Sequence, residues 1–185
     1  MTEEYGIKIV ERNGLRLYEL PFQTIRICKA AISNNALAIR YVDNPTPSLY
    51  RLALKKDWRS MAYMKEAIFT DALYEYALKV NLDCIQYMKK FQTPELCLDA
   101  VSKNPTLLKH VRSDIKTSDF YINLVSRNSR TFYAIPKEEQ TEEICWAALD
   151  NSDIKTLIFR NIRKDLLVKL QDAIISKYNY LKEII

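Results

Sequence analysis

One segment of this sequence recurs six times, and each copy begins with threonine. The fourth copy reads TPELCLDAVSKNPTLLKHV, and successive copies start 22 to 24 residues apart, at Thr24, Thr46, Thr70, Thr93, Thr117 and Thr141. A regular period of this length is typical of repeat proteins, in which each copy forms one small structural unit. Because such a unit cannot bury its own apolar face, the repeats must stack on one another.

The apolar columns of the repeat have the spacing of an α-helix. Apolar side chains stand three, four, seven and eight residues after each threonine, which places them on one helical face. Position seven holds alanine in all copies but the fifth, at Ala31, Ala53, Ala77, Ala100 and Ala148, with Leu124 in the fifth. We expect this column to lie where neighbouring helices approach closely. The strand pattern Leu-x-x-Leu-x-Leu of leucine-rich repeats is absent, which disfavours that fold.

Residues with strong positional preferences predict where each helix begins and ends. The threonine is a favourable N-cap, and Pro47 and Pro94 follow it at the first helical position. Position eleven holds asparagine, replaced by Asp57 in the second copy; in the sixth copy, Asn151 comes one residue early. We predict that this residue ends the helix in a left-handed conformation. A shorter apolar segment follows, so each repeat is predicted to be a helix–turn–helix of about 23 residues.

The two ends of the chain are predicted to cover the outermost repeats. Residues 5–20 alternate apolar and polar around Asn13-Gly14, which predicts a β-hairpin. After the last repeat, a longer helix is predicted with one apolar face, formed by Leu166, Leu167, Leu170, Ile174, Tyr178 and Leu181. The predicted fold is therefore mainly α: a single domain over residues 1–185, with a hairpin cap (1–21), an α-solenoid of six repeats (22–160) and a C-terminal capping helix (161–185).

The repeat pattern resembles a known family. The pattern T-p-E-L-C-x-x-A-V-x-x-N-x-x-x-L-x-x-V looks like that of a tandem-repeat family of unknown function found in bacterial and viral proteins. It is carried here by Thr93, Pro94, Glu95, Leu96, Cys97, Ala100, Val101, Asn104, Leu108 and Val111. The resemblance covers roughly residues 22–159, and the second copy departs from it most. It implies a helical-repeat binding module and brings no catalytic residues.

The residue types that carry catalysis are sparse. His110 stands in a column held elsewhere by tyrosine, which favours a packing role. The cysteines Cys28, Cys84, Cys97 and Cys145 form no C-x-x-C pair and fall at inward positions of different repeats, so we expect four free thiols and no metal site. We find no nucleophile–base arrangement and no nucleotide motif. The sequence predicts neither catalytic activity nor a cofactor, and an enzyme is the third choice of function.

Basic residues at the ends of the first helices form the main surface signal. Stacking would align positions nine and ten as a basic ridge, close to tyrosines of the second segments. The candidate partner-binding residues are Trp58, Tyr63, Arg51, Lys55, Lys56, Lys79, Lys103 and Arg127. Residues 24–70 carry eight Lys or Arg against three acids, which favours a partner with an acidic surface.

Two functions are consistent with such a surface. The first is a non-enzymatic module that binds another protein, as an inhibitor or adaptor of a larger complex in a virus or bacterium. The alternative is binding of single-stranded RNA or DNA, in which lysines contact phosphates and aromatic rings stack on bases. Because the N-terminal residues carry acidic side chains and no apolar run is long enough to cross a bilayer, we expect a cytoplasmic protein without a membrane partner.

Overall fold

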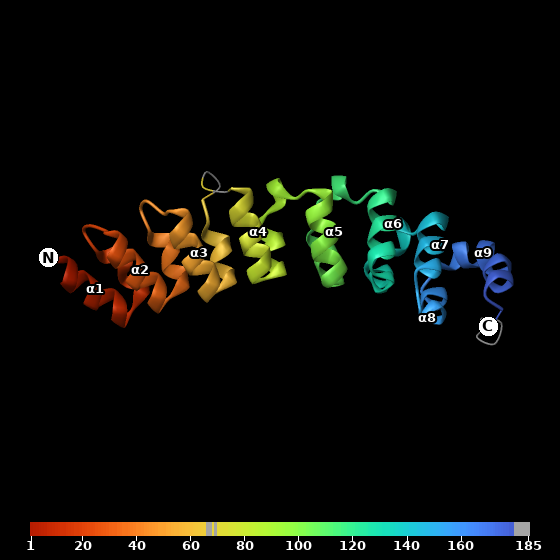
Figure 1. Cartoon of the computed structure of the whole chain (residues 1–185), viewed down its shortest axis with the longest axis horizontal. Coiled ribbons are helices and arrows are strands. Elements are labelled where there is room, and N and C mark those ends of the chain that lie inside the picture. The colour runs from red at the N-terminus through yellow and green to blue at the C-terminus, as the bar shows by residue number, and fades with distance from the viewer. Residues whose placement is uncertain (66–67, 69, 180–185) are drawn as a thin grey trace. The chain divides into compact units, whose positions relative to one another are not determined.

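The computed structural model describes residues 1–65, 68 and 70–179, and these residues are mainly helical, as predicted. The chain divides into two compact units, Met1–Met88 and Lys89–Ile185. In the first unit, α1 (Glu3–Arg12), α2 (Ile25–Asn34), α3 (Pro47–Lys56) and α4 (Asp71–Val80) each pack against the next helix (Figure 1). The single domain over residues 1–185 stays a prediction.

The second unit continues the same pattern. It contains α5 (Pro94–Lys103), α6 (Ser118–Arg127), α7 (Glu142–Asp150), α8 (Lys155–Arg160) and α9 (Lys164–Lys177). Helix α6 packs against both α5 and α7, and ion pairs from Lys169 to Glu142 and from Lys177 to Asp150 join α9 to α7. Helix α9 buries Leu170 and Ile174 on its predicted apolar face, and Leu181 lies outside the described residues.

Each regular repeat is a ten-residue α-helix, one linking residue and a six-residue 3-10 helix. The 3-10 helices are η1 (Gly14–Glu19), η2 (Ala36–Tyr41), η3 (Trp58–Tyr63), η5 (Leu82–Tyr87), η7 (Pro105–His110) and η9 (Ser129–Ala134). Shorter 3-10 turns lie in the connectors between repeats, at η6 (Lys89–Phe91), η8 (Ser113–Ile115) and η10 (Lys137–Glu139). The alanines of position seven are fully buried, as the helical spacing predicted.

The threonine column caps the first helices. In five of the six predicted copies the threonine hydroxyl accepts a hydrogen bond from the backbone N–H three residues later, as in Thr93, which accepts from Leu96 at 3.3 Å. The exception is Thr70, whose side chain makes no such bond to the start of α4. Pro47 and Pro94 occupy the first turn, where the missing N–H has no intrahelical partner to lose.

The predicted left-handed helix end at position eleven is wrong. Asn35, for example, has φ −141° and ψ 115°, and no non-glycine residue described by the structure has a positive φ. Its Oδ1 instead accepts the Leu37 N–H at 3.0 Å, while its own N–H donates to Ala31 O at 2.9 Å. One residue therefore ends the α-helix and caps the 3-10 helix, and the same side-chain bond recurs from Asp57 and Asn128.

The predicted N-terminal β-hairpin is also wrong, because residues 5–20 fold as another copy of the repeat. Thr2 caps α1 through a bond from the Tyr5 N–H, and Asn13 Oδ1 accepts the Leu15 N–H at 3.1 Å at the start of η1. Gly14 lies against the backbone of the next repeat, where a Cβ would be 2.2 Å from the Ala31 carbonyl oxygen. The Asn-Gly pair that suggested a tight turn thus has another role. Asn13 is the linking residue of this copy, and Gly14 lies so close to the next repeat that no side chain fits there.

The sixth predicted copy differs because it is one residue short. Helix α7 has nine residues instead of ten, and Asn151 adopts φ −93° and ψ 6° rather than the extended conformation of the other linking residues. Its amide group donates back to Ala147 O at 2.8 Å. The second segment of this copy, α8, then forms as an α-helix rather than a 3-10 helix.

In some repeats, a glutamine just before the threonine forms side-chain hydrogen bonds with the backbone at the far end of the same repeat. Gln92, which is buried, donates from Nε2 to His110 O at 2.9 Å and accepts the Arg112 N–H on Oε1 at 2.8 Å. Gln23 makes the equivalent bonds to Tyr41 O and Asp43 N, and Gln140 to Asn161 O and Arg163 N. These amide bonds explain why glutamine recurs directly before Thr24, Thr93 and Thr141.

Among the six predicted copies, those without this glutamine carry tyrosine at position four, where the glutamine copies carry cysteine. The Tyr50 hydroxyl accepts the Lys65 N–H at 3.0 Å, at the same repeat position as the N–H groups bound by Gln23 and Gln92. In the fifth copy this position is Pro136, which has no N–H to donate. Within the described part of the chain, the buried Tyr121 hydroxyl accordingly has no hydrogen-bond partner.

This contrast predicts opposite outcomes for one substitution at two equivalent sites. Tyr50→Phe should lower the free energy of unfolding by about 1–2 kcal/mol, because the Lys65 N–H loses its acceptor. Tyr121→Phe should be neutral or raise it by up to about 1 kcal/mol, since it removes a buried hydroxyl that pairs with nothing. Chemical denaturation of both variants measures the difference, and equal losses would contradict the assignment.

Candidate interaction surfaces

The basic ridge predicted at the helix ends is engaged only in part within the first unit. Lys55, Lys56 and Lys79 are exposed, and the Lys56 ammonium donates to the Ser33 carbonyl of the preceding repeat. The guanidinium of Arg51 lies 5.7 Å from the centre of the Tyr76 ring. Within the described residues, the side chains of Lys55 and Lys79 make no hydrogen bond or ion pair. The ridge in this unit therefore offers these two lysines as free cations.

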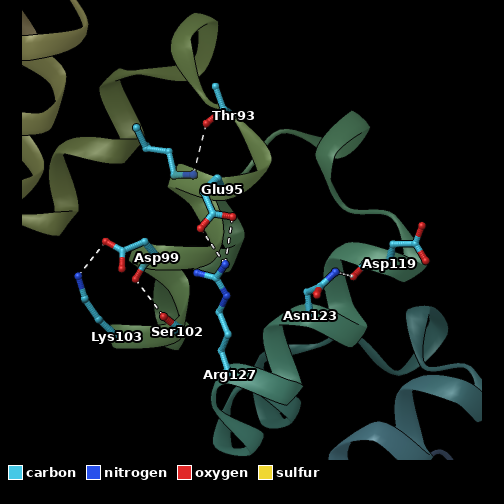
Figure 2. Close-up of polar contacts among 9 residues, drawn as sticks. Thr93, Glu95, Asp99, Ser102, Lys103, Asp119, Asn123 and Arg127 are labelled. Carbon is cyan, nitrogen blue, oxygen red and sulfur yellow. Dashed lines mark hydrogen bonds and ion pairs between the residues drawn. The ribbon is translucent and has the colours of Figure 1, made fainter.

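In the second unit, the two predicted ridge residues are paired with acids. Arg127 on α6 contacts Glu95 on α5 at 2.8 Å, and Lys103 contacts Asp99 one turn earlier on α5, also at 2.8 Å (Figure 2). Exposed pairs of this kind stabilise a fold little, but each one neutralises a charge that a phosphate would otherwise meet. The structure does not relate these residues in space to the lysines of the first unit.

A second surface is built from the 3-10 helices of the first unit, and we call it the tyrosine–arginine stack. It consists of Tyr18, Arg40, Tyr41 and Tyr63, contributed by η1, η2 and η3, which pack side by side. The Tyr18 and Tyr41 ring centres lie 5.3 Å apart, and the Arg40 guanidinium lies 4.4 Å from the Tyr41 ring centre and 5.6 Å from that of Tyr63. Tyr18 is 63% exposed and Tyr63 is 39% exposed, so the stack faces solvent.

The candidate residue Trp58 belongs to a neighbouring aromatic pair. Its ring centre lies 6.4 Å from that of Tyr87 on η5, and Tyr87 is 42% exposed. Trp58 itself is half-buried. Since η3 carries both Trp58 and Tyr63, the pair and the stack occupy adjoining 3-10 helices. The structure thus assembles aromatic side chains from four successive repeats of one unit.

Carboxylates lie beside these aromatic side chains. Glu19 follows Tyr18 and pairs with Arg16 at 2.7 Å, and Asp57 precedes Trp58 and pairs with Arg59 at 3.0 Å. In both pairs the hydrogen bond from the arginine lowers the pKa of the carboxyl group, so both acids are charged at neutral pH. The surroundings of the rings are therefore of mixed sign rather than uniformly basic.

The four cysteines are free and buried, as predicted. Burial raises the pKa of the Cys84 thiol to about 12 and that of Cys97 and Cys145 to about 11, while Cys28 shifts in the same direction. These thiols are therefore protonated at neutral pH, which suits apolar packing and makes them poor nucleophiles. His110 lies half-buried in η7, where its backbone carbonyl receives the Gln92 amide.

The burial of the thiols predicts their reactivity. In the folded protein at pH 8, an aromatic disulfide reagent should react slowly with all four cysteines, because they are protonated and shielded. In denaturant without reductant it should count four thiols. A lower count would reveal a disulfide, and one rapidly reacting thiol in the folded protein would contradict the burial of that residue.

The described residues provide little for metal binding or for enclosing a small molecule. Among them, no group of three or more His, Cys, Asp or Glu side chains is placed to hold a metal ion. An open hollow between α5 and α6, with a volume of about 420 Å³, is bordered by Arg112 and Asp114, which bind each other. No helix in the described ranges has both the length and the apolar character that a membrane crossing requires.

Comparison with known proteins identified no relative of this chain. The chain matched no protein-family model, no curated protein and no solved structure. The resemblance to the tandem-repeat family of unknown function therefore stays a prediction. What the protein does has to be argued from the surfaces described above.

Three members of the tyrosine–arginine stack, Tyr18, Arg40 and Tyr41, are absent from the candidate residues named from the sequence. The predicted hairpin over residues 5–20 contains Tyr18, and the repeat pattern gives Arg40 and Tyr41 no specific role. The signal for Tyr18 was present: Thr2 lies 22 residues before Thr24, and Asn13 lies eleven residues after Thr2. With that copy recognised, Tyr18 falls in the second segment beside the tyrosines of the following repeats.

Proposed function

We propose that this protein is a non-enzymatic helical-repeat module that binds another protein in the cytoplasm. The observation that carries the proposal is the tyrosine–arginine stack, in which exposed aromatic rings are held in place by Arg40. Tyrosine, tryptophan and arginine are the residues most enriched at the centres of protein interfaces, because they offer large contact areas together with hydrogen-bonding groups. Burying such rings against a partner removes a large apolar area from water, which makes the free energy of binding more favourable.

The repeat architecture supports this use. Each unit stacks its helices in chain order, as in an α-solenoid, and solenoids bind partners along extended surfaces made by equivalent positions of successive repeats. The stack and the Trp58–Tyr87 pair have this character, since they draw on the 3-10 helices of four successive repeats. An adaptor or inhibitor of a larger complex is the role that a small module of this kind best fits.

Single-stranded nucleic acid is the second candidate partner. Lys55 and Lys79 favour it, because both are exposed and their side chains make no hydrogen bond or ion pair within the described residues. The paired states of Lys103 and Arg127 weigh against it, since phosphate binding depends on the number of cations available to displace counterions.

Affinity capture with matched variants tests the proposal. The tagged protein is used to capture partners from cells that express it, with and without nuclease. We expect the same captured protein in both cases, lost with Tyr63→Ala and retained when Lys55, Lys56, Lys79 and Lys103 are all changed to Glu. Capture that disappears with nuclease and with the four Glu substitutions would instead assign the protein to nucleic acid.

A further inference from the structure

One face of the N-terminal copy, which begins at Thr2, is exposed although its counterpart is buried in the next copy. There, Ile27 stands three residues after its threonine, is completely buried and lies against α1, where a Cβ on Gly6 would be 3.0 Å from Ile27 Cδ1. Position three therefore faces the preceding repeat. In the N-terminal copy the same position is Tyr5, which is 59% exposed on the end helix of the first unit (Figure 1).

The exposed face carries cations. Five residues form it and line an open hollow of about 180 Å³, and we call them the N-terminal face: Tyr5, Lys8, Ile9, Arg12 and Arg16. Arg16 pairs with Glu19, whereas the side chains of Lys8 and Arg12 make no hydrogen bond or ion pair within the described part of the chain. Glu4 and Glu11, which are also exposed on α1, do not border the hollow. The N-terminal face therefore presents two uncompensated positive charges, one helical turn apart.

Position fourteen indicates that this face is not made for regular stacking. The next two copies hold Ala38 and Ser60 there, both completely buried, whereas the N-terminal copy holds the exposed Arg16. Covering Arg16 with another regular repeat would take its charge out of water at a large desolvation cost. A cap that served solubility alone would be polar throughout, but Tyr5 and Ile9 keep ring and aliphatic surface beside the cations. Aromatic and arginine side chains together are typical of protein-binding surfaces.

We propose that the N-terminal face binds an amphipathic helix of another protein, on which two apolar and two acidic residues share the contact face. A helix fits because, within the first unit, each later α-helix packs against the α-helix before it. The apolar residues lie on Tyr5 and Ile9, and the acids, one turn apart, pair with Lys8 and Arg12. The inference goes beyond the proposed function, since it uses none of the four residues of the tyrosine–arginine stack.

Charge disfavours the other occupants of this face. A second copy of this chain could approach it with α9, where Val168 is 81% exposed. However, α9 carries three Lys and two Asp, and one of these acids, Asp165, is already paired with Arg163. A nucleic-acid strand would release few counterions at two free cations, which gives weak binding. An acidic helix is the occupant that compensates both charges.

Fluorescence anisotropy with defined peptides tests the inference on the full chain. The probe is a labelled alanine-rich peptide of about 20 residues, long enough to form a helix alone, with two Leu and two Glu on one face. Matched peptides carry Gln or Lys in place of Glu, and an oligouridylate represents nucleic acid. The protein variants are Lys8→Gln with Arg12→Gln, Lys8→Glu with Arg12→Glu, and Tyr5→Ala. The control, Lys29→Gln with Lys109→Gln, removes two exposed cations outside the face, and circular dichroism confirms that every variant is folded.

We expect the glutamate peptide to bind the wild-type protein and the control variant equally. The glutamine peptide should bind the wild-type protein at least about fivefold more weakly, because two ion pairs are lost. The double Gln variant should no longer distinguish the two peptides, and Tyr5→Ala should weaken both. The double Glu variant should reject the glutamate peptide and bind the lysine peptide, since the charges on both sides are then exchanged.

Four results would overturn the inference: no binding of the glutamate peptide, equal affinity of the glutamate and glutamine peptides for the wild-type protein, no binding of the lysine peptide to the folded double Glu variant, or tighter binding of the oligouridylate. Sedimentation that shows self-association of the wild-type protein, lost in the double Gln variant, would assign the face to a second copy instead. A protein captured from cells through Tyr63 would leave the proposed function standing in all these cases, so the two failures are distinguishable.

Discussion

Replacing Gly14 by alanine is expected to destabilise the first unit by about 3 kcal/mol. The new Cβ would lie 2.2 Å from the Ala31 carbonyl oxygen and 3.1 Å from the Asn35 nitrogen, both backbone atoms of the next repeat. Backbone atoms cannot turn aside as side chains do, so η1 would have to move away from α2. The Gly14 N–H would then also lose its hydrogen bond to Asn34 Oδ1. Overpacking typically costs roughly 1–3 kcal/mol, and this site combines it with a lost bond.

Gly6→Ala is the matched control for this prediction. A Cβ at Gly6 would approach Ile27 Cδ1 to 3.0 Å, and that atom is the flexible end of a side chain. Both substitutions add one methyl group at a buried glycine of the same repeat, but a much smaller loss is expected at Gly6. Urea denaturation followed by circular dichroism measures both variants, and equal unfolding midpoints would refute the close contact at Gly14.

Replacing Ala100 by phenylalanine should destabilise the second unit by roughly 3 kcal/mol. Ala100 lies on α5 in the column that faces the neighbouring helix, and its side chain is completely buried. A phenylalanine ring has no room there without separating α5 from α6, and overpacking of this size falls at the upper end of the usual range of about 1–3 kcal/mol. The same denaturation experiment measures the effect.

Lys103→Ala, one turn further along α5, provides the comparison. The Lys103 side chain is 58% exposed and contacts an equally exposed Asp99, so its loss should change stability by less than about 0.5 kcal/mol. Similar melting temperatures for the two variants would mean that the repeat columns have been assigned to the wrong faces of the helix.

The first helix of each repeat could be predicted from the sequence because several independent signals agree there. Thr93 as the cap, Pro94 at the first position and Ala100 on the inward face all favour the same ten-residue helix, and the structure places all three as expected. The second segment could not be predicted as a 3-10 helix, because runs of that type beyond four residues are uncommon. Its six residues begin where the linking residue caps them and end where the connector turns away.

The N-terminal prediction failed because two local signals conflicted with the period. Asn13-Gly14 between alternating residues favours a hairpin on local grounds, and Gly6 interrupts the columns that identify the other copies. The tyrosine–arginine stack was out of reach for a related reason: it is formed by side chains from three repeats, and the pairing of Arg40 with two rings depends on side-chain conformation. Repeat columns predict which residues are exposed, but not which exposed residues meet.

Only one residue links the α-helix to the 3-10 helix within a repeat, and it is hydrogen-bonded to both. This determines where residues can be inserted into or deleted from the protein. Asn35, for example, is hydrogen-bonded to the helix before it and to the 3-10 helix after it, so one added residue would break both bonds. The sixth predicted copy shows the effect of a single deletion here, since its second segment takes a different helical form. Variation in repeat period is instead absorbed between repeats, where connectors such as 111–116 are longer than 42–45 and carry an extra 3-10 turn. Loops, labels or affinity tags inserted in the connectors should therefore be tolerated, whereas insertions beside the linking residues should not.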